Sequence, residues 1–140
     1  MKIRAADRKK LIATALGMVR RAYAPYSRFQ VGAAVLTSSG RIYGGANVEN
    51  ASYGAAVCAE RAAVLKAVNA GDRELAAVAV CGGREGKVTG LCVPCGICRQ
   101  VLREFADPAE LKVYVVQSAN DYREYSLEDL LPESFGPESL

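Results

Sequence analysis

The chain has 140 residues, 51% of them hydrophobic, which is enough apolar material for one compact domain spanning residues 1–140. Its 18 basic and 15 acidic residues are scattered, and the formal charge of +3 gives nucleic-acid binding little electrostatic support. The sequence contains no histidine, which excludes Ser-His-Asp and Cys-His nucleophiles and histidine-bound metal sites.

The first part of the chain predicts a helix followed by a β-hairpin. Apolar residues recur at helical intervals over residues 7–24, and Pro25 is expected to end this helix. Two apolar runs, 29–36 and 41–48, flank the turn sequence "TSSG", a pattern typical of a hairpin. Because both runs are apolar on both faces, we expect helices to cover the sheet.

The rest of the chain alternates between helical and extended patterns. The predicted elements are helix 58–71 with a stop at Gly71, strand 75–82, helix 95–106, strand 111–118, and a short helix within 126–135 with Ser126 as N-cap and Pro132 as its stop. This order implies βαβ crossovers, so we predict an α/β fold whose partly parallel sheet lies between helices.

Five cysteines are an odd number, and no apolar run reaches the length of a signal peptide or of the ~20 residues of a membrane span. We therefore expect a cytoplasmic protein with reduced thiols, some of them bound to a metal. Cys81 lies in an apolar strand and is interpreted as a small buried hydrophobe. Cys92 is interpreted as a residue that binds no metal.

The other three cysteines suit a zinc site. Cys58 begins one predicted helix, and Cys95 and Cys98 begin another, where helix dipoles and free N–H groups favour thiolates. A structural zinc site normally has four protein ligands, whereas these cysteines supply three. One coordination position is then open to water, and zinc lowers the pKa of bound water to roughly 7 in favourable sites.

Two charged residues beside Cys58 complete this interpretation. Glu60 falls in the first turn of the same helix, so it can lie close to the metal without binding it and transfer a proton from water to a leaving group. Three thiolates outweigh the charge of Zn²⁺, which would weaken its effect on water. The two helix N-termini and Arg61 can offset this excess of negative charge.

These motifs resemble a known family. "NVENASYGAAVCAERAAVLKAV" followed by "VPCGICRQVLREF" is similar to the zinc-dependent cytidine deaminases of pyrimidine salvage. The resemblance runs from "AYAPYSRFQVGAA" to "LLPESFGPESL", nearly the whole chain. Cysteine at the first ligand position resembles the small-subunit, homotetrameric branch. The implied fold is a three-layer α/β/α sandwich with a mixed sheet of about five strands.

The resemblance also implies a reaction. Cys58, Cys95 and Cys98 would bind one zinc ion per subunit, and Glu60 would be the catalytic proton shuttle. Hydroxide on the zinc would attack C4 of cytidine or deoxycytidine, giving uridine or deoxyuridine and ammonia. The partners implied are a small nucleoside and three further copies of the chain, with neither nucleic acid nor membrane.

Further roles follow only from the resemblance. It implies that Phe29 packs on the pyrimidine ring, that Asn47 and Glu49 bind ribose hydroxyls, and that the backbone of Ala59 bonds the base edge. Arg61 would support the thiolates, and four residues would reach a neighbouring subunit's site: Tyr26, Ala51, Tyr53 and Phe135. Ile97 and Val93 depart from the family's usual alanine and serine and touch neither a ligand nor the shuttle.

Three alternatives remain open at this stage. A deaminase of a modified cytosine nucleoside, such as blasticidin S, would share the zinc and glutamate motifs. A polynucleotide deaminase would need a basic groove, which the sequence does not indicate. A non-enzymatic zinc module would use Cys92 as a fourth ligand and would be indifferent to Glu60→Gln. The preference between cytidine and deoxycytidine is left undetermined.

Overall fold

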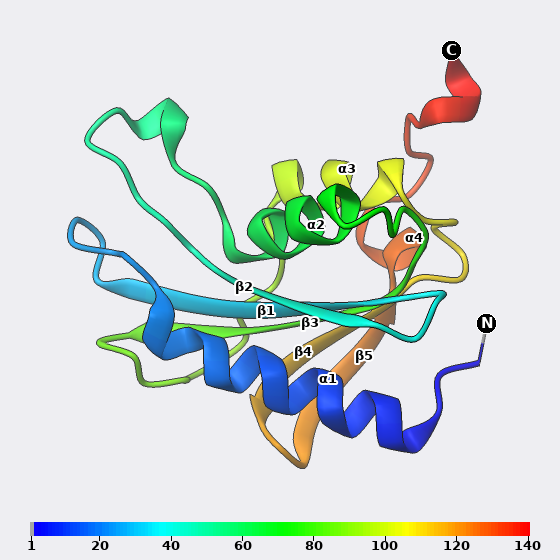
Figure 1. Cartoon of the computed structure of the whole chain (residues 1–140). Helices are drawn as coiled ribbons and strands as arrows, with labels where there is room; N and C mark the ends of the chain where they lie inside the picture. The colour runs from blue at the N-terminus through cyan, green and yellow to red at the C-terminus, as the bar shows by residue number, and fades with distance from the viewer. Residues whose placement is uncertain (1) are drawn as a thin grey trace.

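The computed structural model describes residues 2–140 and has three layers. Helix α1 (Ala5–Met18) covers one face of a central sheet, while α2 (Ala59–Asn69) and α3 (Gly96–Glu104) cover the other (Figure 1). The five strands are β1 (Phe29–Thr37), β2 (Ile42–Ala46), β3 (Leu75–Arg84), β4 (Lys112–Ser118) and β5 (Asp121–Ser126). The predicted α/β/α sandwich is therefore confirmed.

The sheet is mixed, as predicted, with the strand order β2-β1-β3-β4-β5. β1 forms the predicted hairpin with β2 and also pairs antiparallel with β3. β3 and β4 are parallel, with Val78 opposite Val113, and α3 lies in the crossover between them. The segment leaving the carboxyl end of β3 therefore leads directly into the start of α3, a common place for a ligand site in α/β proteins.

Apolar residues on both faces of the sheet make two separate cores. On one face Leu11, Ile12 and Ala15 of α1 pack in a cluster with residues such as Leu36 and Tyr114. On the other face the buried side chains of α2 and α3 pack against the sheet, in a cluster that includes Ala63, Val64, Leu102, Val35, Val78 and Val113. Burial on both faces explains why these strands are nearly continuous in apolar residues.

The end of the first helix differs from the prediction. α1 stops at Met18, a 3-10 turn η1 (Val19–Arg21) follows, and the chain is extended by Ala22, so the predicted helix to residue 24 is wrong. Tyr23 instead bridges to Val48, where its N–H donates to the Asn47 carbonyl. Pairing with a distant segment here overrides the helical pattern.

β5 has no predicted counterpart at its position, although the expected sheet size was about five strands. It is an edge strand whose side chains are mostly exposed or half-buried, so its sequence lacks the apolar run of the inner strands. The end of α2 agrees with the prediction, because Gly71 has a φ of 96°, a left-handed conformation that suits glycine.

The short helical segments complete the fold. Ser126 caps α4 (Leu127–Leu130), accepting a hydrogen bond from the Asp129 N–H, as predicted. Two 3-10 turns, η2 (Tyr53–Ala55) and η3 (Pro137–Ser139), lie in the loop before α2 and at the C-terminus. Within residues 2–140, no helix combines the length and the hydropathy that crossing a membrane requires.

Candidate metal centre

The N-termini of α2 and α3 bring the three predicted cysteine ligands together. Cys58 is the N-cap of α2 and Cys95 the N-cap of α3, and their carbonyls accept the first helical hydrogen bonds from Ala62 and Arg99. Cys98 lies one turn into α3 and is buried. The three sulfur atoms all lie within 4.8 Å of one another.

The spacing of the sulfur atoms fits a tetrahedral zinc ion. With Zn–S bonds of roughly 2.3 Å, two thiolates on a tetrahedral ion lie about 3.8 Å apart. The Cys58 and Cys95 sulfurs are 3.9 Å apart, and the Cys95 and Cys98 sulfurs are 3.5 Å apart. Two of the three sulfur pairs therefore lie close to the separation that a shared zinc ion requires, and the third pair lies within 4.8 Å.

Electrostatics favours a thiolate in this cluster. Hydrogen bonding from the Cys98 thiol, aided by Cys95 and by the positive charge of Arg61, lowers the pKa of Cys58 to about 6 despite partial burial. The same hydrogen bond, together with burial, raises the pKa of Cys98, because it donates its proton to Cys58. Arg61 thus contributes positive charge beside Cys58.

Glu60 lies in the first turn of α2, directly after the buried Ala59, and is only 4% exposed. Burial raises its pKa to about 7, and the neighbouring Cys58 charge adds to this effect. A buried carboxyl next to three thiols is costly to keep as an isolated charge. Its position therefore indicates a chemical role more than a structural one.

The remaining two cysteines lie apart from this cluster. Cys81 is fully buried in β3, as predicted, where its thiol donates to the Gly32 carbonyl across 3.7 Å and burial raises its pKa to about 11. Cys92 packs half-buried against the core under α2 and α3, and burial raises its pKa to about 12. Among the described residues, the cysteines that gather are Cys58, Cys95 and Cys98, which leaves Cys92 outside the candidate site.

Asn47 ties the end of β2 to the start of β1. Its Oδ1 accepts from the Val31 N–H at 2.9 Å, and its Nδ2 donates to the Phe29 carbonyl at 2.9 Å. The amide thus fixes the backbone that carries Phe29, whose side chain is 38% exposed. Two of the predicted substrate residues, Asn47 and Phe29, are brought together in this way.

Glu49 lies at the opening of the loop that follows. Its carboxylate accepts hydrogen bonds from the N–H groups of Tyr26 and Ser27 and from the Ser27 hydroxyl. These bonds, chiefly the one from the hydroxyl, lower the pKa of Glu49. Ser27 was not predicted as a site residue, because its contact depends on two loops separated by more than 20 positions.

An open hollow of about 360 Å³ lies at this loop, and its lining includes Tyr26, Glu49 and Tyr53. Ala51 is exposed on the same loop. A second, larger hollow of about 720 Å³ lies between Arg73, Arg103 and Pro137 and contains none of the predicted site residues. The thiols and Glu60 lie outside this second hollow, so we place the candidate site at the cysteine cluster.

Several apolar side chains near these segments are exposed in the single chain. The exposed fractions are 54% for Tyr26, 82% for Tyr53 and 59% for Phe135, and Val93 and Ile97 beside the cysteines are exposed as well. Within the described chain, no hydrogen bond joins Phe135 to the thiols or to Glu60. Its carbonyl accepts a hydrogen bond from Gln100 on α3.

Comparison with known proteins identifies the relatives of this chain. The model of the cytidine and deoxycytidylate deaminase zinc-binding region matches residues 5–115. A cytidine deaminase of Halalkalibacterium halodurans is 46% identical over 134 residues, which cover 96% of this chain and 98% of that protein.

Solved structures agree. The crystal structure of cytidine deaminase from Burkholderia pseudomallei is 46% identical, with a TM-score of 0.80 over 90% of this chain and 97% of its own. The one from Mycobacterium tuberculosis is 43% identical, with a TM-score of 0.76 over 91% and 95%.

Proposed function

The chain belongs to the cytidine and deoxycytidylate deaminase family, and from this premise we propose that it hydrolyses cytidine and deoxycytidine to uridine and deoxyuridine with release of ammonia. The observation that carries the proposal is the cluster of Cys58, Cys95 and Cys98 with the buried carboxyl of Glu60 beside it. We take residues 1–140 as a single catalytic domain.

The cofactor is zinc, which the family's zinc-binding region and the three-thiol cluster both support. Cys58, Cys95 and Cys98 would hold one ion per subunit, leaving the fourth tetrahedral position free of protein. Zinc, when bound, supplies the Lewis acidity that makes water a nucleophile near neutral pH. Arg61 and the N-termini of α2 and α3 offset the negative charge of the three thiolates.

Glu60 would move the protons of the reaction. Its place in the first turn of α2 holds the carboxylate beside the cluster, while its burial excludes bulk water from it. From there it would accept a proton from the attacking water and deliver it to the departing amino group. This role needs a fixed carboxylate that binds no metal, which is how Glu60 differs from the three thiols.

Recognition of the nucleoside would fall to residues already fixed by hydrogen bonds. The backbone of Ala59 would bond the base edge, and Phe29 would pack on the ring. Asn47 uses one N–H and one lone pair on β1, so a second N–H and lone pair remain for a ribose hydroxyl. Glu49 accepts three hydrogen bonds of about four possible, which leaves capacity for one hydroxyl.

The assembly would be a homotetramer whose sites are shared between subunits. Tyr26, Tyr53 and Phe135 are large and more than half exposed, which favours contact with another chain over permanent exposure to water. Together with Ala51 they would reach a neighbour's site and close the pocket around the nucleoside. In the described chain, all five cysteines are free thiols, which supports a cytoplasmic location. A role in pyrimidine salvage would follow from the proposed reaction, which returns uridine and deoxyuridine.

Release of ammonia from cytidine and deoxycytidine by the purified protein is the direct test. The wild type should turn over both nucleosides, whereas Glu60→Gln should keep its zinc and fold and lose roughly 10²-fold to 10⁴-fold in kcat, the usual contribution of a positioned proton-transfer group. The Cys92→Ala variant serves as the control and should retain both zinc and activity.

A zinc-loaded wild type that ignores both nucleosides but deaminates blasticidin S would contradict the choice of substrate. A structural zinc module would give a different result. Cys92→Ala would then lose zinc, and Glu60→Gln would not differ in activity from the wild type. Turnover of single-stranded polynucleotides in preference to nucleosides would point to the remaining alternative.

A further inference from the structure

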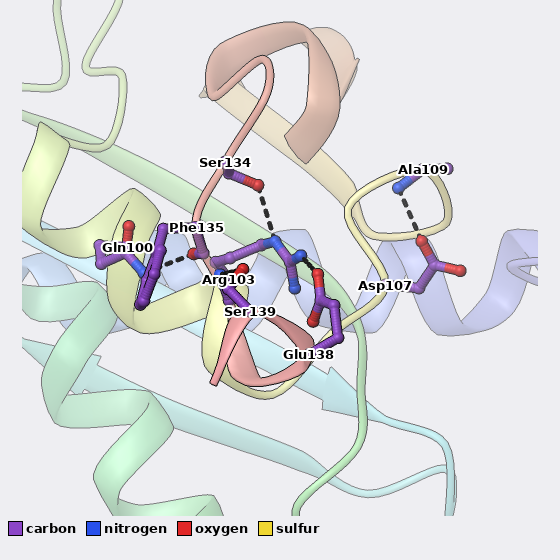
Figure 2. Close-up of polar contacts among 9 residues, drawn as sticks. Gln100, Arg103, Asp107, Ala109, Ser134, Phe135, Glu138 and Ser139 are labelled. Carbon is purple, nitrogen blue, oxygen red and sulfur yellow. Dashed lines mark hydrogen bonds and ion pairs between the residues drawn. The ribbon is translucent and has the colours of Figure 1, made fainter.

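The C-terminal segment 134–139 is bound to the outer side of α3 by a buried arginine. Arg103 is one of two charged residues in the described chain, with Glu60, that are almost fully buried. Its Nε donates to the Ser134 hydroxyl at 2.7 Å, and its guanidinium pairs with the Glu138 carboxylate (Figure 2). A buried guanidinium needs such partners, and here both come from the tail.

The backbone between these two partners lies directly on the guanidinium. A Cβ atom added to Gly136 would stand 2.4 Å from the central carbon of the Arg103 guanidinium, so any other residue would force the guanidinium and the tail apart. The Gly136 N–H also donates to the Ser139 hydroxyl, which closes the 3-10 turn η3. The residues on both sides of Phe135 are therefore held in place.

Phe135 is fixed in its backbone but free in its ring. Gln100 donates from Nε2 to the Phe135 carbonyl at 2.9 Å, and Figure 2 shows the two residues side by side. The side chain itself remains 59% exposed. A large apolar ring carried on an anchored backbone is suited to contact with another molecule, because little backbone freedom remains to be lost on binding.

The geometry of α3 places the tail on a different face of the helix from Cys98. Gln100 follows Cys98 by two residues, a rotation of about 200° around the helix. Cys98 accordingly is buried, whereas Gln100 is exposed. The helix that supplies two thiols to its own site thus holds the tail on a different face.

We propose that Arg103 and Gln100 are positioning residues that hold segment 134–139 so that Phe135 enters the nucleoside site of a neighbouring copy of the chain. The inference rests on the proposed role of Phe135 in a shared site. It adds the residues, Arg103 and Gln100, that position the Phe135 ring. It also links each subunit's cysteine-bearing helix to the substrate pocket of the next subunit.

Hybrid assemblies of two kinds of subunit test the proposal. A Glu60→Gln subunit has an intact tail but no proton shuttle, and a Phe135→Ala subunit has an intact shuttle but no ring. The two subunits are co-expressed with different tags and purified as hybrids. Where a Phe135→Ala subunit receives the ring of a Glu60→Gln neighbour, the site should have a KM for cytidine about tenfold below that of the Phe135→Ala homotetramer. A difference of this size is typical of one buried aromatic contact.

Arg103→Met is then placed in one subunit at a time. In the Glu60→Gln subunit, which donates the tail, it should abolish the low-KM sites. In the Phe135→Ala subunit it should leave them, since that subunit has no ring to position. Purely structural damage to α3 would give the opposite pattern, because it would harm the subunit whose thiols and Glu60 do the chemistry.

Two further variants guard against failure of Arg103→Met to fold. Gly136→Ala and Gln100→Ala keep Arg103 unsubstituted, and each should also raise KM when the subunit that donates the tail carries it. Arg123→Met, at an exposed position of β5, is the control and should leave KM unchanged.

Low-KM sites that persist with Arg103→Met, Gly136→Ala and Gln100→Ala in the donor would overturn the positioning role alone. Hybrids without any low-KM sites would overturn the shared site itself, and the positioning role with it.

Discussion

A single chain supplies different shares of the two sides of the candidate site, the metal side and the nucleoside side. On the metal side, Cys58, Cys95 and Cys98 meet within 4.8 Å and Glu60 is buried beside them. On the nucleoside side, Tyr53 is 82% exposed and Phe135 is 59% exposed. One chain thus brings the three candidate metal ligands together, whereas the exposed rings on the nucleoside side fit our proposal that a second copy completes the pocket.

Removal of a thiol should have the largest effect, because it breaks the side that is complete. Cys98→Ser should cost most of the bound zinc and lower kcat/KM by at least about 10³-fold, since the ion organises the whole reaction. Metal analysis and ammonia release on the same sample give both quantities. Cys81→Ala, in the opposite core, is the matched control; equal zinc loss from both variants would contradict the assignment.

Removal of an aromatic ring should have a smaller effect, confined to the open side. Phe135→Ala should raise KM for cytidine by about tenfold while zinc content stays the same, because the variant loses a contact at an interface and keeps every metal ligand. Leu140→Ala removes an apolar side chain from the end of the same tail and should leave KM unchanged. An unchanged KM in Phe135→Ala would mean that the ring lies outside the pocket.

The smallest predicted effect is a pH dependence at Glu49. Hydrogen bonds from Ser27 and Tyr26 lower its pKa in the folded state, so the carboxylate stabilises the fold above its unfolded pKa of about 4.3. This contribution is lost as the pH falls through the lower folded value. Glu49→Gln should therefore be less stable than wild type near pH 6, and the two should converge once the pH has fallen below the folded-state pKa of Glu49.

Urea unfolding of both proteins between pH 3 and pH 7 gives this comparison. A stability difference that does not change with pH would show that the hydrogen bonds at Glu49 do not depend on its charge.

The metal side was predictable from sequence for a local reason. Each thiol lies at the N-cap or in the first turn of a helix, and C-x-x-C fixes the spacing of Cys95 and Cys98 within one turn. The approach of Cys58 to this pair depends on the tertiary fold. Part of that fold was predicted, because the order of elements implied a parallel crossover, which the structure forms with β3, α3 and β4.

The features that escaped prediction depend on distant partners. Arg103 finds Ser134 and Glu138 at separations of 31 and 35 residues, and no periodic signal joins them. The end of α1 was misplaced because Tyr23 pairs with Val48. β5 lies at the edge of the sheet, where most side chains are exposed or half-buried, so its sequence lacks the apolar run that marks the inner strands.

The most direct test of the difference between the two sides is activity measured against dilution. Cytidine turnover, molar mass and zinc content would be determined together on samples of decreasing protein concentration. The account predicts that dissociated subunits keep one zinc ion each and lose their low KM for cytidine as the assembly disappears. A monomer that retains both zinc and the full kcat/KM would contradict it.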